Sequence, residues 1–474
     1  MKSKNNMTRR EFVGRTSTGI AAAFAAPLIL PKSVRGANDQ INIAVLGIRG
    51  RGNAHIEKLG SIPGVKIHTL CDCDENLFAE RVKTIEEKFG YTPNTEYDLR
   101  TVYDNPEIDA VANAMPNHWH ALATVWAAQA GKHVYVEKPS CHTVWEGQKM
   151  IEAARKYNVL VQVGYQNRSR SNTNAAIKFL HDGGIGKIYM VRGQCFRQRW
   201  DIGSYPDGYM QEGETFSLTT DGKRPMPAYT KEYMDKVHYD LWMGPAEKRP
   251  FNRNRFHYNW HWQWEYGNGD TGNQGPHQFD VALWGLNKSE HPATVYSKGD
   301  YYVFDSQQNT PNVQTSVFQY TDGTLFEFAT RGLFTNREGK MNVGVIFYGE
   351  KGYVEVDGGG NWQSFFGYDK EPGPGSESEK EESNAPLSTV GVGDEGHFGN
   401  FVKALRSGDR NDLTCDIEVG HKSAAISHMA NISYLLQKEL KIHPEKEEFT
   451  NSKKANKMLR RRPYREPYVV PERV

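Results

Sequence analysis

Two side chains stand out because their positions suit proton transfer at a hydroxyl group. Lys138 follows a run of β-branched and aromatic residues and precedes Pro139, so it should leave a strand with extended backbone. His277 lies three residues before Asp280, at the start of an apolar helical stretch. A histidine can take a proton from an alcohol, and a lysine can stabilise the oxygen as a carbonyl forms. Alone, either residue is more often structural, so the surrounding sequence has to decide.

The segment around His277 combines aromatic rings with glycines. Trp260 to Asp280 contains four aromatic residues before a glycine-rich turn, and such rings can stack on a sugar. We expect the substrate to contact Lys138 and His277, together with Trp264, Asn273 and Tyr165. Core packing is the ordinary role of such rings and accounts for most of those in the chain.

A glycine-rich turn predicts a dinucleotide site. The strand Ile41–Leu46 runs into Gly47, Ile48, Arg49, Gly50, Arg51 and Gly52, and a helix can begin at Asn53. A second strand, Val65–Leu70, leads to Asp72, twenty residues beyond Gly52, where a dinucleotide fold places its ribose-binding acid. A carboxylate there repels a 2′-phosphate, so NAD is expected rather than NADP. Arg49 occupies the place of the usual second glycine, and an ordinary strand-to-helix turn is the alternative.

Three further strands complete a doubly wound parallel sheet. They are expected at 108–114, 134–137 and 159–163, with helices running to Ala130 and over 143–157. Ligands of such sheets bind at the carboxyl ends of the strands. We therefore expect the cofactor to be contacted by the glycine turn and Asp72, and also by Pro116, Asn117, His120, Glu137, Lys138 and Gln166. No metal site is expected, because His118 and His120 have no third ligand at useful spacing.

The pattern of alternating strands and helices ends after residue 166. Alternating strands are expected at 187–198, 294–304, 312–320, 324–330, 342–348 and 353–356, which predicts an α+β domain with a large, mainly antiparallel sheet. Residues 205–233 form an irregular insertion, and 371–382 are expected to be a disordered surface loop by composition. Helices are expected at 395–406 and 416–437. The predicted domains are 38–166 and 167–440, followed by a tail, 441–474, that packs on the body.

Composition and charge narrow the functional class. Residues 1–37 carry seven basic groups and one acid; subtracting them from the totals of 58 and 57 leaves 51 basic and 56 acidic groups. A mildly acidic body argues against nucleic-acid binding, and no apolar stretch is long enough to span a membrane. The five cysteines are odd in number and lack zinc-site spacing.

The N-terminal segment resembles an export signal. Arg9 and Arg10, followed by Phe12 and a weakly apolar run to Leu30, are similar to a twin-arginine signal peptide spanning 1–37. Because that route exports folded proteins, we expect the mature chain in the periplasm. A plain basic N-terminus is the alternative.

Together these motifs resemble one enzyme family. The turn from Gly47 to Gly52, Asp72, Pro116 with Asn117, Glu137-Lys138-Pro139, and the Gly275, His277, Asp280 pattern are similar to the glucose-fructose oxidoreductase, inositol dehydrogenase and MocA (Gfo/Idh/MocA) family. The resemblance covers nearly everything after residue 40. It implies catalytic roles for Lys138 and His277, a nicotinamide cofactor and a homo-oligomer, either dimer or tetramer. The family often has an aspartate four residues before the histidine, where this chain has Asn273. His277 should then be a weaker base, or Asp270, Asp280 or Glu265 supplies the missing charge.

Three functions remain open on the sequence. The first is oxidoreduction of a carbohydrate or polyol hydroxyl, with a tightly bound cofactor recycled in place, because an exported enzyme has no pool of free nucleotide. The second is NAD-dependent glycoside hydrolysis through transient oxidation and elimination. The third is a nucleotide- or sugar-binding protein without turnover.

Overall fold

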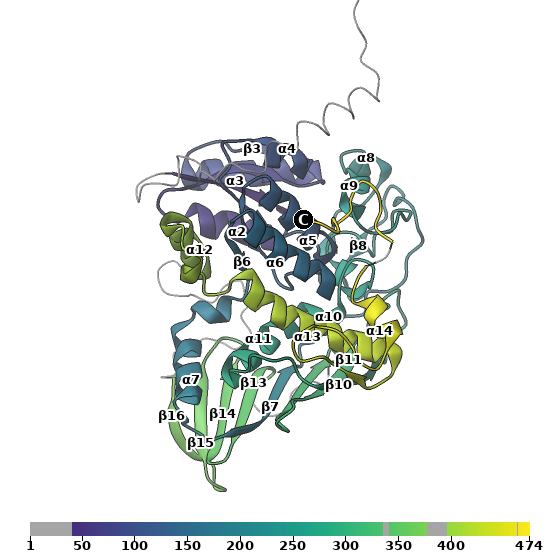
Figure 1. The fold of residues 1–474 in the computed structure, drawn as a ribbon. Helices are drawn as coiled ribbons and strands as arrows, with labels where there is room; N and C mark the ends of the chain where they lie inside the picture. The colour runs from purple at the N-terminus through teal and green to yellow at the C-terminus, as the bar shows by residue number, and fades with distance from the viewer. Residues whose placement is uncertain (1–39, 335–340, 377–395, 462) are drawn as a thin grey trace, which may run out of the picture.

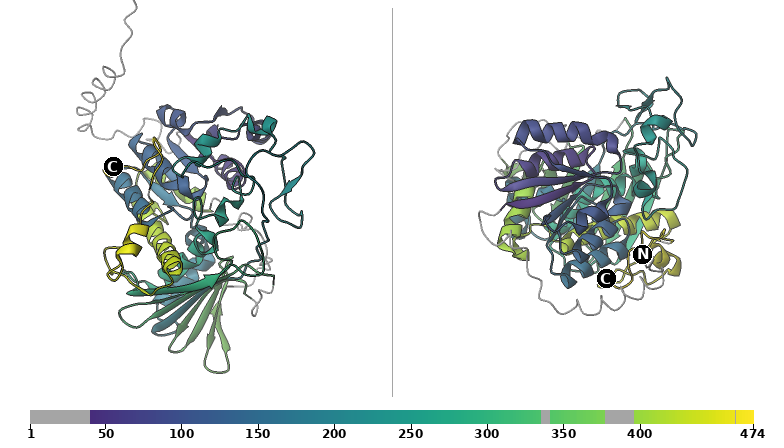
Figure 2. Two further views of the ribbon diagram at one scale, coloured as in Figure 1. Left: turned by 90° about the vertical axis from the view of Figure 1, so that its right-hand side faces the viewer. Right: turned by 90° about the horizontal axis from the view of Figure 1, so that it is seen from above.

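Two sheets with α13 (Ile417–Leu436) between them organise the chain in the computed structural model, which describes residues 40–334, 341–376, 396–461 and 463–474 (Figure 1). The predicted signal peptide lies outside the described residues. The first sheet is parallel and comes from the N-terminal part. The second is larger and mostly antiparallel, and it fans out at the other end of the molecule (Figure 2). The predicted fold class is thereby confirmed.

The first sheet has six strands in the order β3-β2-β1-β4-β5-β6. The strands are β1 (Ile41–Leu46), β2 (Val65–Cys71), β3 (Asn94–Glu96), β4 (Ala110–Asn113), β5 (His133–Val136) and β6 (Val161–Val163). All five pairings are parallel, and the strand order reverses between β1 and β4. Ligands of such sheets bind at this switch point. The sequence predicted five strands; β3 was missed because it is three polar residues at the sheet edge.

Helices cover both faces of this sheet. They are α2 (Arg51–Gly60), α3 (Phe78–Phe89), α4 (Leu99–Asp104), α5 (Asn117–Gln129) and α6 (Val144–Lys156). One further helix arrives from far along the chain. Phe398 and Phe401 of α12 (Gly396–Ser407) are buried in the same cluster as Ile43 and Tyr135. Part of the core of the first domain therefore comes from residues 396–407, far along the chain.

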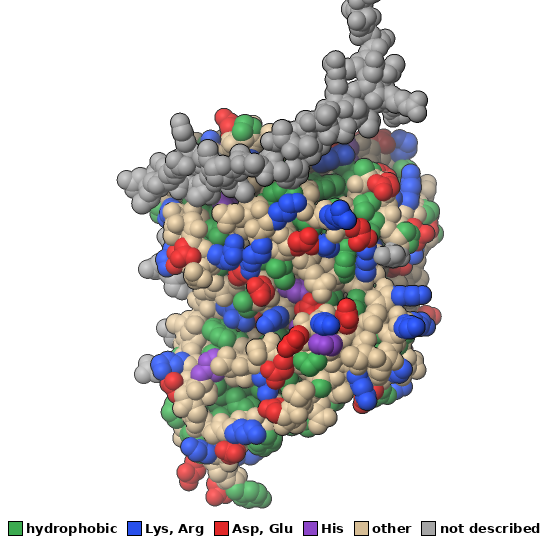
Figure 3. Space-filling view, in the orientation of Figure 1, with side chains coloured by type: hydrophobic (Ala, Val, Ile, Leu, Met, Phe, Trp, Pro, Cys, Tyr) green, Lys and Arg blue, Asp and Glu red, His purple; other side chains and the backbone are tan. Residues whose placement is uncertain are grey.

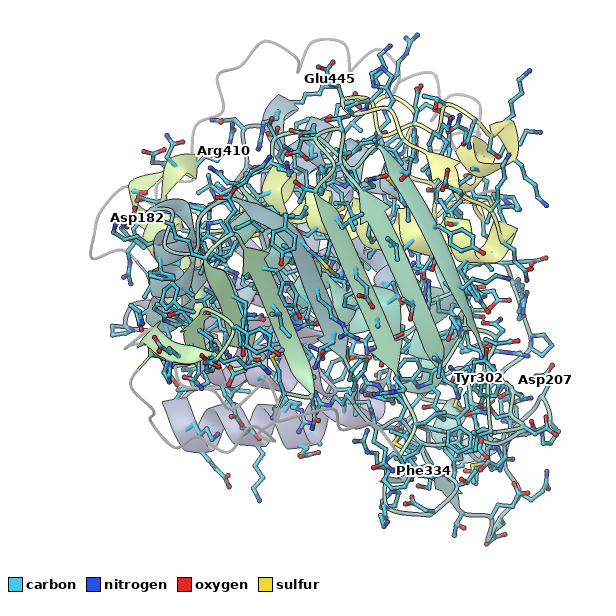
Figure 4. All side chains as sticks on the ribbon, turned by 90° about the horizontal axis from the view of Figure 1, so that it is seen from below. Asp182, Asp207, Tyr302, Phe334, Arg410 and Glu445 are labelled. Atoms are coloured by element: carbon cyan, nitrogen blue, oxygen red, sulfur yellow. The ribbon has the colours of Figure 1, made fainter. Side chains whose placement is uncertain are left out.

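The second sheet has nine strands in the order β16-β15-β14-β13-β7-β12-β11-β10-β17. The strands are β7 (Ile188–Cys195), β10 (Thr294–Asp300), β11 (Val313–Gln319), β12 (Leu325–Arg331), β13 (Val343–Gly349), β14 (Gly352–Asp357), β15 (Trp362–Phe366), β16 (Glu371–Gly375) and β17 (Leu440–Lys441). Only the β7 to β12 pairing is parallel. One face packs on α11 (Gly275–Leu286) and α13, and Figure 4 shows the other face without a helix across it.

One prediction for this sheet was wrong. Residues 371–375 form β16 rather than a disordered loop, and Pro372 pairs with Phe365 of β15. Proline and glycine are tolerated there because β16 is the outermost strand, where one side of the backbone needs no partner. Residues 377–382 of the same predicted loop lie outside the described residues.

Smaller elements complete the second half. They are α7 (Ser171–His181), which was not predicted, β8 (Phe216–Ser217), β9 (Pro225–Met226), α8 (Lys231–Met234), α9 (Tyr239–Met243), α10 (Gly269–Asn273) and α14 (Lys453–Met458). Short 3-10 turns cover Glu75–Leu77, Gln166–Ser169, Asn259–Trp262 and Arg410–Asp412. The segment 205–262, here called the inserted segment, has its own aromatic core, which includes Tyr229, Trp242 and Phe256.

The chain ends on the first domain. Tyr468, Val470 and Val474 belong to the buried cluster around α5 and β5, and the C-terminus lies beside α5 in Figure 1. No helix among the described residues is both long and apolar enough to cross a membrane. Basic and acidic side chains are interspersed on the face shown in Figure 3, without a one-signed patch.

The turn between β1 and α2 tests the local fold. A Cβ on Gly52 would lie 1.8 Å from the carbonyl oxygen of Gly47, whereas a Cβ on Gly50 would meet nothing within 4 Å. We expect Gly52→Ala to lower the free energy of unfolding by about 1–3 kcal/mol. Gly50→Ala is the matched control, and chemical denaturation is the measurement. Equal stability of the two variants would show that the turn is not packed as described.

Candidate functional site

A cavity of about 400 Å³ lies between the two domains. Its volume is within the range of small-molecule sites. The first domain lines it with Gly47, Arg49, Gly50, Arg51, Cys71, Asp72, Cys73, Tyr97, Asp98, Leu99, Ala114, Met115, Pro116, Asn117, Trp119, His120, Glu137, Lys138 and Gln166. From beyond residue 166 come Arg197, Arg199, Arg224, Leu241, Trp242, His257, Tyr258, Trp260, His261, Asn273, Gln274 and His277.

The glycine turn forms one wall and is fixed from outside the cavity. Gly47 has φ of +79°, which side chains rarely allow. Arg81 of α3 donates to the carbonyl oxygens of Ile48 and Arg49 at 3.0 and 3.1 Å. Helix α2 begins at Arg51 without a side-chain cap, so N–H groups of its first turn are free to meet an anion at the cavity wall. This donor set fits the pyrophosphate of a dinucleotide.

Asp72 lies at the end of β2, beside this turn. Its Oδ2 accepts from the Ile48 N–H at 2.8 Å, and its Oδ1 accepts from the Asp74 N–H at 3.0 Å. Burial raises the pKa of Asp72 to about 6. A carboxylate oxygen can accept more than one hydrogen bond, so ribose hydroxyls would add to these contacts.

Glu137 is neutralised by the first domain itself. The Arg51 Nε lies 2.7 Å from its Oε1, and the His55 Nε2 lies 3.0 Å from the same oxygen. Burial alone would raise the pKa of Glu137, but Arg51 and His55 outweigh it and hold that pKa well below its usual value. Arg51 is therefore committed to Glu137 rather than left free for a phosphate.

Lys138 connects the two domains. Its Nζ donates to the main-chain oxygen of Asn273 at 2.8 Å and to the Asn273 Oδ1 at 3.2 Å. Both acceptors are neutral groups. Burial lowers the pKa of Lys138 to about 8, because the desolvated ammonium is less stable than it would be in water. Lys138 can therefore change its charge close to neutral pH.

His277 lies in the first turn of α11 and lines the same cavity. The helix begins at Gly275, two residues before His277. Burial, with a further contribution from the nearby Lys138, holds the pKa of His277 well below its usual value. Its imidazole is therefore neutral, and it is a weaker base than an exposed histidine. The ring of Tyr165 packs edge-on behind it, with centroids 6.0 Å apart.

The three acids that could have compensated for Asn273 are all paired with arginines. Arg199 binds Asp270 through two hydrogen bonds of 3.0 and 2.5 Å. Arg168 Nε lies 3.0 and 2.9 Å from the two oxygens of Asp280. Glu265 pairs with Arg249 at 2.9 Å. Among the described residues, none of these three carboxylates is hydrogen-bonded to His277.

Asn268 joins the loops that carry the two candidate catalytic residues. Its side chain donates to the carbonyl oxygen of His142, a few residues after Lys138, and accepts from the Asn117 Nδ2 at 3.0 Å. Its own carbonyl oxygen accepts from Asn431 of α13 at 2.9 Å. Three buried asparagine side chains, Asn117, Asn268 and Asn431, thus link the segments that carry Lys138 and His277.

The predicted site residues fall into two groups. Those in the cavity wall are Gly47, Arg49, Gly50, Arg51, Asp72, Pro116, Asn117, His120, Glu137, Lys138, Gln166, Asn273 and His277. The others are Ile48, Gly52, Tyr165 and Trp264, which do not line it. Ile48 and Gly52 shape the turn, and Tyr165 supports His277. Trp264 points to α13 instead, with its ring 6.4 Å from that of Tyr434.

Sequence reasoning missed the contribution of the inserted segment and of the chain after β7. Arg197 and Arg199 follow β7, and the inserted segment supplies Arg224, His257, Tyr258, Trp260 and His261. Arg197 and Arg199, at alternate positions just after the strand β7, could have indicated this contribution to the cavity. No group of three or more His, Cys, Asp or Glu side chains in the described parts of the chain is arranged to hold a metal ion.

Two family descriptions match this chain. "Oxidoreductase family, NAD-binding Rossmann fold" matches residues 41–165, and "Oxidoreductase family, C-terminal alpha/beta domain" matches 213–330 and 391–470. Together they span more than half of the sequence. The chain belongs to the Gfo/Idh/MocA oxidoreductase family. Its first domain is the NAD-binding domain of that family, in agreement with the turn and with Asp72.

Curated relatives of this family member match over a limited stretch. Levoglucosan dehydrogenase of Pseudarthrobacter phenanthrenivorans is 30% identical over 168 residues, 34% of this chain and 42% of the relative. Myo-inositol 2-dehydrogenase of Thermotoga maritima is 27% identical, over 32% of this chain and 44% of the relative. A glycosyl hydrolase family 109 protein of Shewanella putrefaciens is 24% identical, over 32% and 38%. The chain thus spans less than half the length of each.

Solved structures resemble the whole architecture. Aldose-aldose oxidoreductase from Caulobacter crescentus has a TM-score of 0.59 at 17% identity, covering 85% of this chain and 100% of that one. Levoglucosan dehydrogenase in complex with NADH and levoglucosan has a TM-score of 0.58 at 20% identity, covering 85% and 99%. At these identities the likeness establishes the fold.

Position 273 tests the electrostatics of the site. We expect Asn273→Asp to raise the pKa of Lys138 from about 8 toward its ordinary 10.5, because a carboxylate would replace the neutral oxygen 3.2 Å from Nζ. The lysine titration can be followed by NMR of its ε-carbon. Asn273→Leu is the apolar control and should not raise this pKa. An unchanged titration in Asn273→Asp would place Lys138 away from this side chain in solution.

Proposed function

We propose that this protein is an NAD-dependent oxidoreductase acting on a hydroxyl group of a carbohydrate or polyol. The observation that carries the proposal is the joint position of Lys138 and His277, which face one cavity between the NAD-binding domain and the second domain. When bound, the nicotinamide would accept a hydride from the carbon that bears the hydroxyl. The named activities of the relatives, levoglucosan and myo-inositol dehydrogenases, support a sugar or polyol as the substrate class.

The two residues would divide the work at the hydroxyl. His277 is neutral and would accept the hydroxyl proton. Lys138, in its ammonium form, would donate a hydrogen bond to the same oxygen and stabilise negative charge there as the carbonyl forms. Trp260 and Tyr258 present aromatic rings at the cavity wall, where a sugar ring can stack.

The pH dependence tests this division of roles. If catalysis needs the ammonium of Lys138, kcat should fall as the pH rises through about 8, where Lys138 loses its proton. Lys138→Ala should lower kcat by about 100-fold or more, while the affinity for NAD is retained. The measurement is the nicotinamide absorbance under saturating substrate across pH. A rate that rises through pH 8 and stays high would instead make Lys138 the base.

Glycoside hydrolysis is the second candidate, favoured by the similarity to a glycosyl hydrolase family 109 protein. Transient oxidation of a ring hydroxyl, elimination of the aglycone and re-reduction would leave the cofactor unchanged overall. Release of nitrophenol from a nitrophenyl glycoside, without any added electron acceptor, supports this reaction. Accumulation of a keto-sugar with no released nitrophenol supports simple oxidoreduction.

We also propose that NAD is held tightly and recycled in place. The inserted segment contacts the NAD-binding domain at Asp74, two residues after the expected ribose-binding Asp72. The Oδ2 of this buried carboxylate accepts from the Tyr233 hydroxyl at 2.8 Å and lies 2.8 Å from the His257 Nε2. Backbone hydrogen bonds from Glu75 to Lys236 and from His238 to Cys73 join the same two segments. A dinucleotide beside Asp72 would have to displace or pass this cover to leave.

Loosening this cover should speed cofactor release. We expect Tyr233→Phe to release NAD about tenfold faster, because it removes a hydrogen bond to a buried carboxylate. Tyr209→Phe is the matched control, since Tyr209 lies in the same segment and is 50% exposed. The measurement is loss of bound nucleotide during dialysis. Equal rates in the two variants would exclude the segment as the barrier to release.

Export and assembly complete the proposal. The arginine pair near the N-terminus supports export by the twin-arginine route to the periplasm. Replacing Arg9 and Arg10 with lysine should then retain the protein in the cytoplasm, and secretion that continues would contradict this route.

The uncovered face of the second sheet supports a homo-oligomer. Tyr296, Val317 and Leu325 there are 37–41% exposed, and sedimentation of a monomer would exclude the assembly.

A further inference from the structure

Cations gather where the second domain lines the cavity. Arg197 and Arg199 enter it from the chain after β7, and Arg224 enters from the turn between β8 and β9. Arg199 is neutralised by Asp270, and its guanidinium lies 5.2 Å from the ring centroid of Trp262. Arg197 and Arg224 pair with no carboxylate in the part of the chain that the structure describes. The guanidinium of Arg224 instead lies 5.8 Å from the ring centroid of Tyr258.

Within the described residues, no carboxylate pairs with Arg197 or Arg224 at this end of the cavity. The carboxylates in the cavity wall are Asp72, Asp98 and Glu137, and all three belong to the first domain. Asp98 is bound by Arg100, and Glu137 by Arg51 and His55. Burial lowers the pKa of His261 to about 3, and that of His277 well below its usual value, so these rings add no charge. Among the described residues, the cavity-lining cations without a carboxylate partner are therefore Arg197, Arg224, the ammonium of Lys138 and, from the glycine turn, Arg49, whose guanidinium contacts Met226.

We propose that the substrate is an anionic carbohydrate, whose acidic group is bound by Arg197, with Arg224 contributing from the cavity wall. This rests on the proposed function, because it assigns the substrate class of the same site. A guanidinium suits the planar, two-pronged geometry of a carboxylate and also binds phosphate and sulfate. Positive charge without a carboxylate partner in a partly enclosed cavity raises the local concentration of anions. It does not oppose the contacts that the neutral part of a sugar ring makes with the cavity wall.

The cofactor does not account for Arg197. The backbone N–H groups that suit a pyrophosphate lie at the start of α2, in the first domain, where Gly50 lines the cavity. Arg197 instead leaves β7, the strand beside β12 and β13 of the second sheet. On that side lie α11 and His277, since Gly193 of β7 packs against Gln278. The free guanidinium therefore belongs to the half of the cavity that receives the hydroxyl group.

The test compares neutral and anionic ligands on the NAD-loaded protein by calorimetry. The ligands are methyl β-D-glucoside, methyl β-D-glucuronide, glucose 6-phosphate and glucose 6-sulfate. We expect at least one anionic compound to bind about tenfold or more tightly than the neutral glucoside, as a charge-assisted contact provides. The compound bound most tightly identifies the acidic group as carboxylate, phosphate or sulfate.

Two variants assign the effect to the arginine. Arg197→Gln should remove the preference for the anion while NAD affinity is unchanged. Arg473→Gln, which removes an exposed cation outside the cavity, should keep it. The absence of a preference for any anionic ligand, or a loss of NAD affinity in Arg197→Gln, would overturn the proposal. Reduction of the bound NAD is recorded in the same experiments. Tight binding of an anion without NAD reduction would contradict the proposed function alone. NAD reduction by the neutral glucoside, without a preference for anions, would contradict this inference alone.

Discussion

The contact between Lys138 and Asn273 is the constraint on which the site depends. It joins the end of the first sheet to the short helix that precedes α11, and so sets where His277 stands relative to the NAD-binding domain. The ammonium of Lys138 is removed from water, and its hydrogen-bond acceptors are the two neutral amide oxygens of Asn273. A strand-end lysine that would titrate near its ordinary value in water is thereby brought to a pKa of about 8. The same contact links the position of the lysine with its reactivity.

The arginine and carboxylate pairs around the cavity have a common consequence. Asp270, Asp280 and Glu137 are all buried, and each is bound by an arginine from a different element. Removing one partner of such a pair leaves an uncompensated charge, which costs about 3–5 kcal/mol. These pairs therefore serve as fixed supports. Among the described residues, Lys138 and His277, which line the same cavity, are in no such pair.

The sequence was most informative where local pattern and tertiary environment agree. Buried parallel strands read as short apolar runs, so β1, β2, β4, β5 and β6 could be placed, and Lys138 with them. β3 and β16 could not, because an edge strand needs neither an apolar run nor a full set of backbone donors. Trp264 was assigned to the substrate on residue type alone; in the structure it does not line the cavity, and its ring lies 6.4 Å from that of Tyr434 in α13.

The ion pairs around the site could not be predicted from local sequence, because their partners are far apart in the chain. Arg199 and Asp270 are 71 positions apart, and Arg168 and Asp280 are 112 apart, so no spacing rule pairs them. His277 lies in the first turn of α11 and lines the cavity, and none of the three acids that could have supported it does so among the described residues, because each is paired with an arginine. The role of the inserted segment as a cover over Asp74 likewise depends on contacts across more than 150 residues.

The most direct test of the central claim is a crystal structure of the protein with bound NAD and a carbohydrate ligand. The account predicts the nicotinamide ring in the cavity between the domains. It also predicts one ligand hydroxyl within hydrogen-bonding distance of both the Lys138 Nζ and the His277 ring, with its carbon facing the nicotinamide. A carbohydrate bound with its hydroxyls away from these two residues, or a nicotinamide outside the cavity, would contradict it.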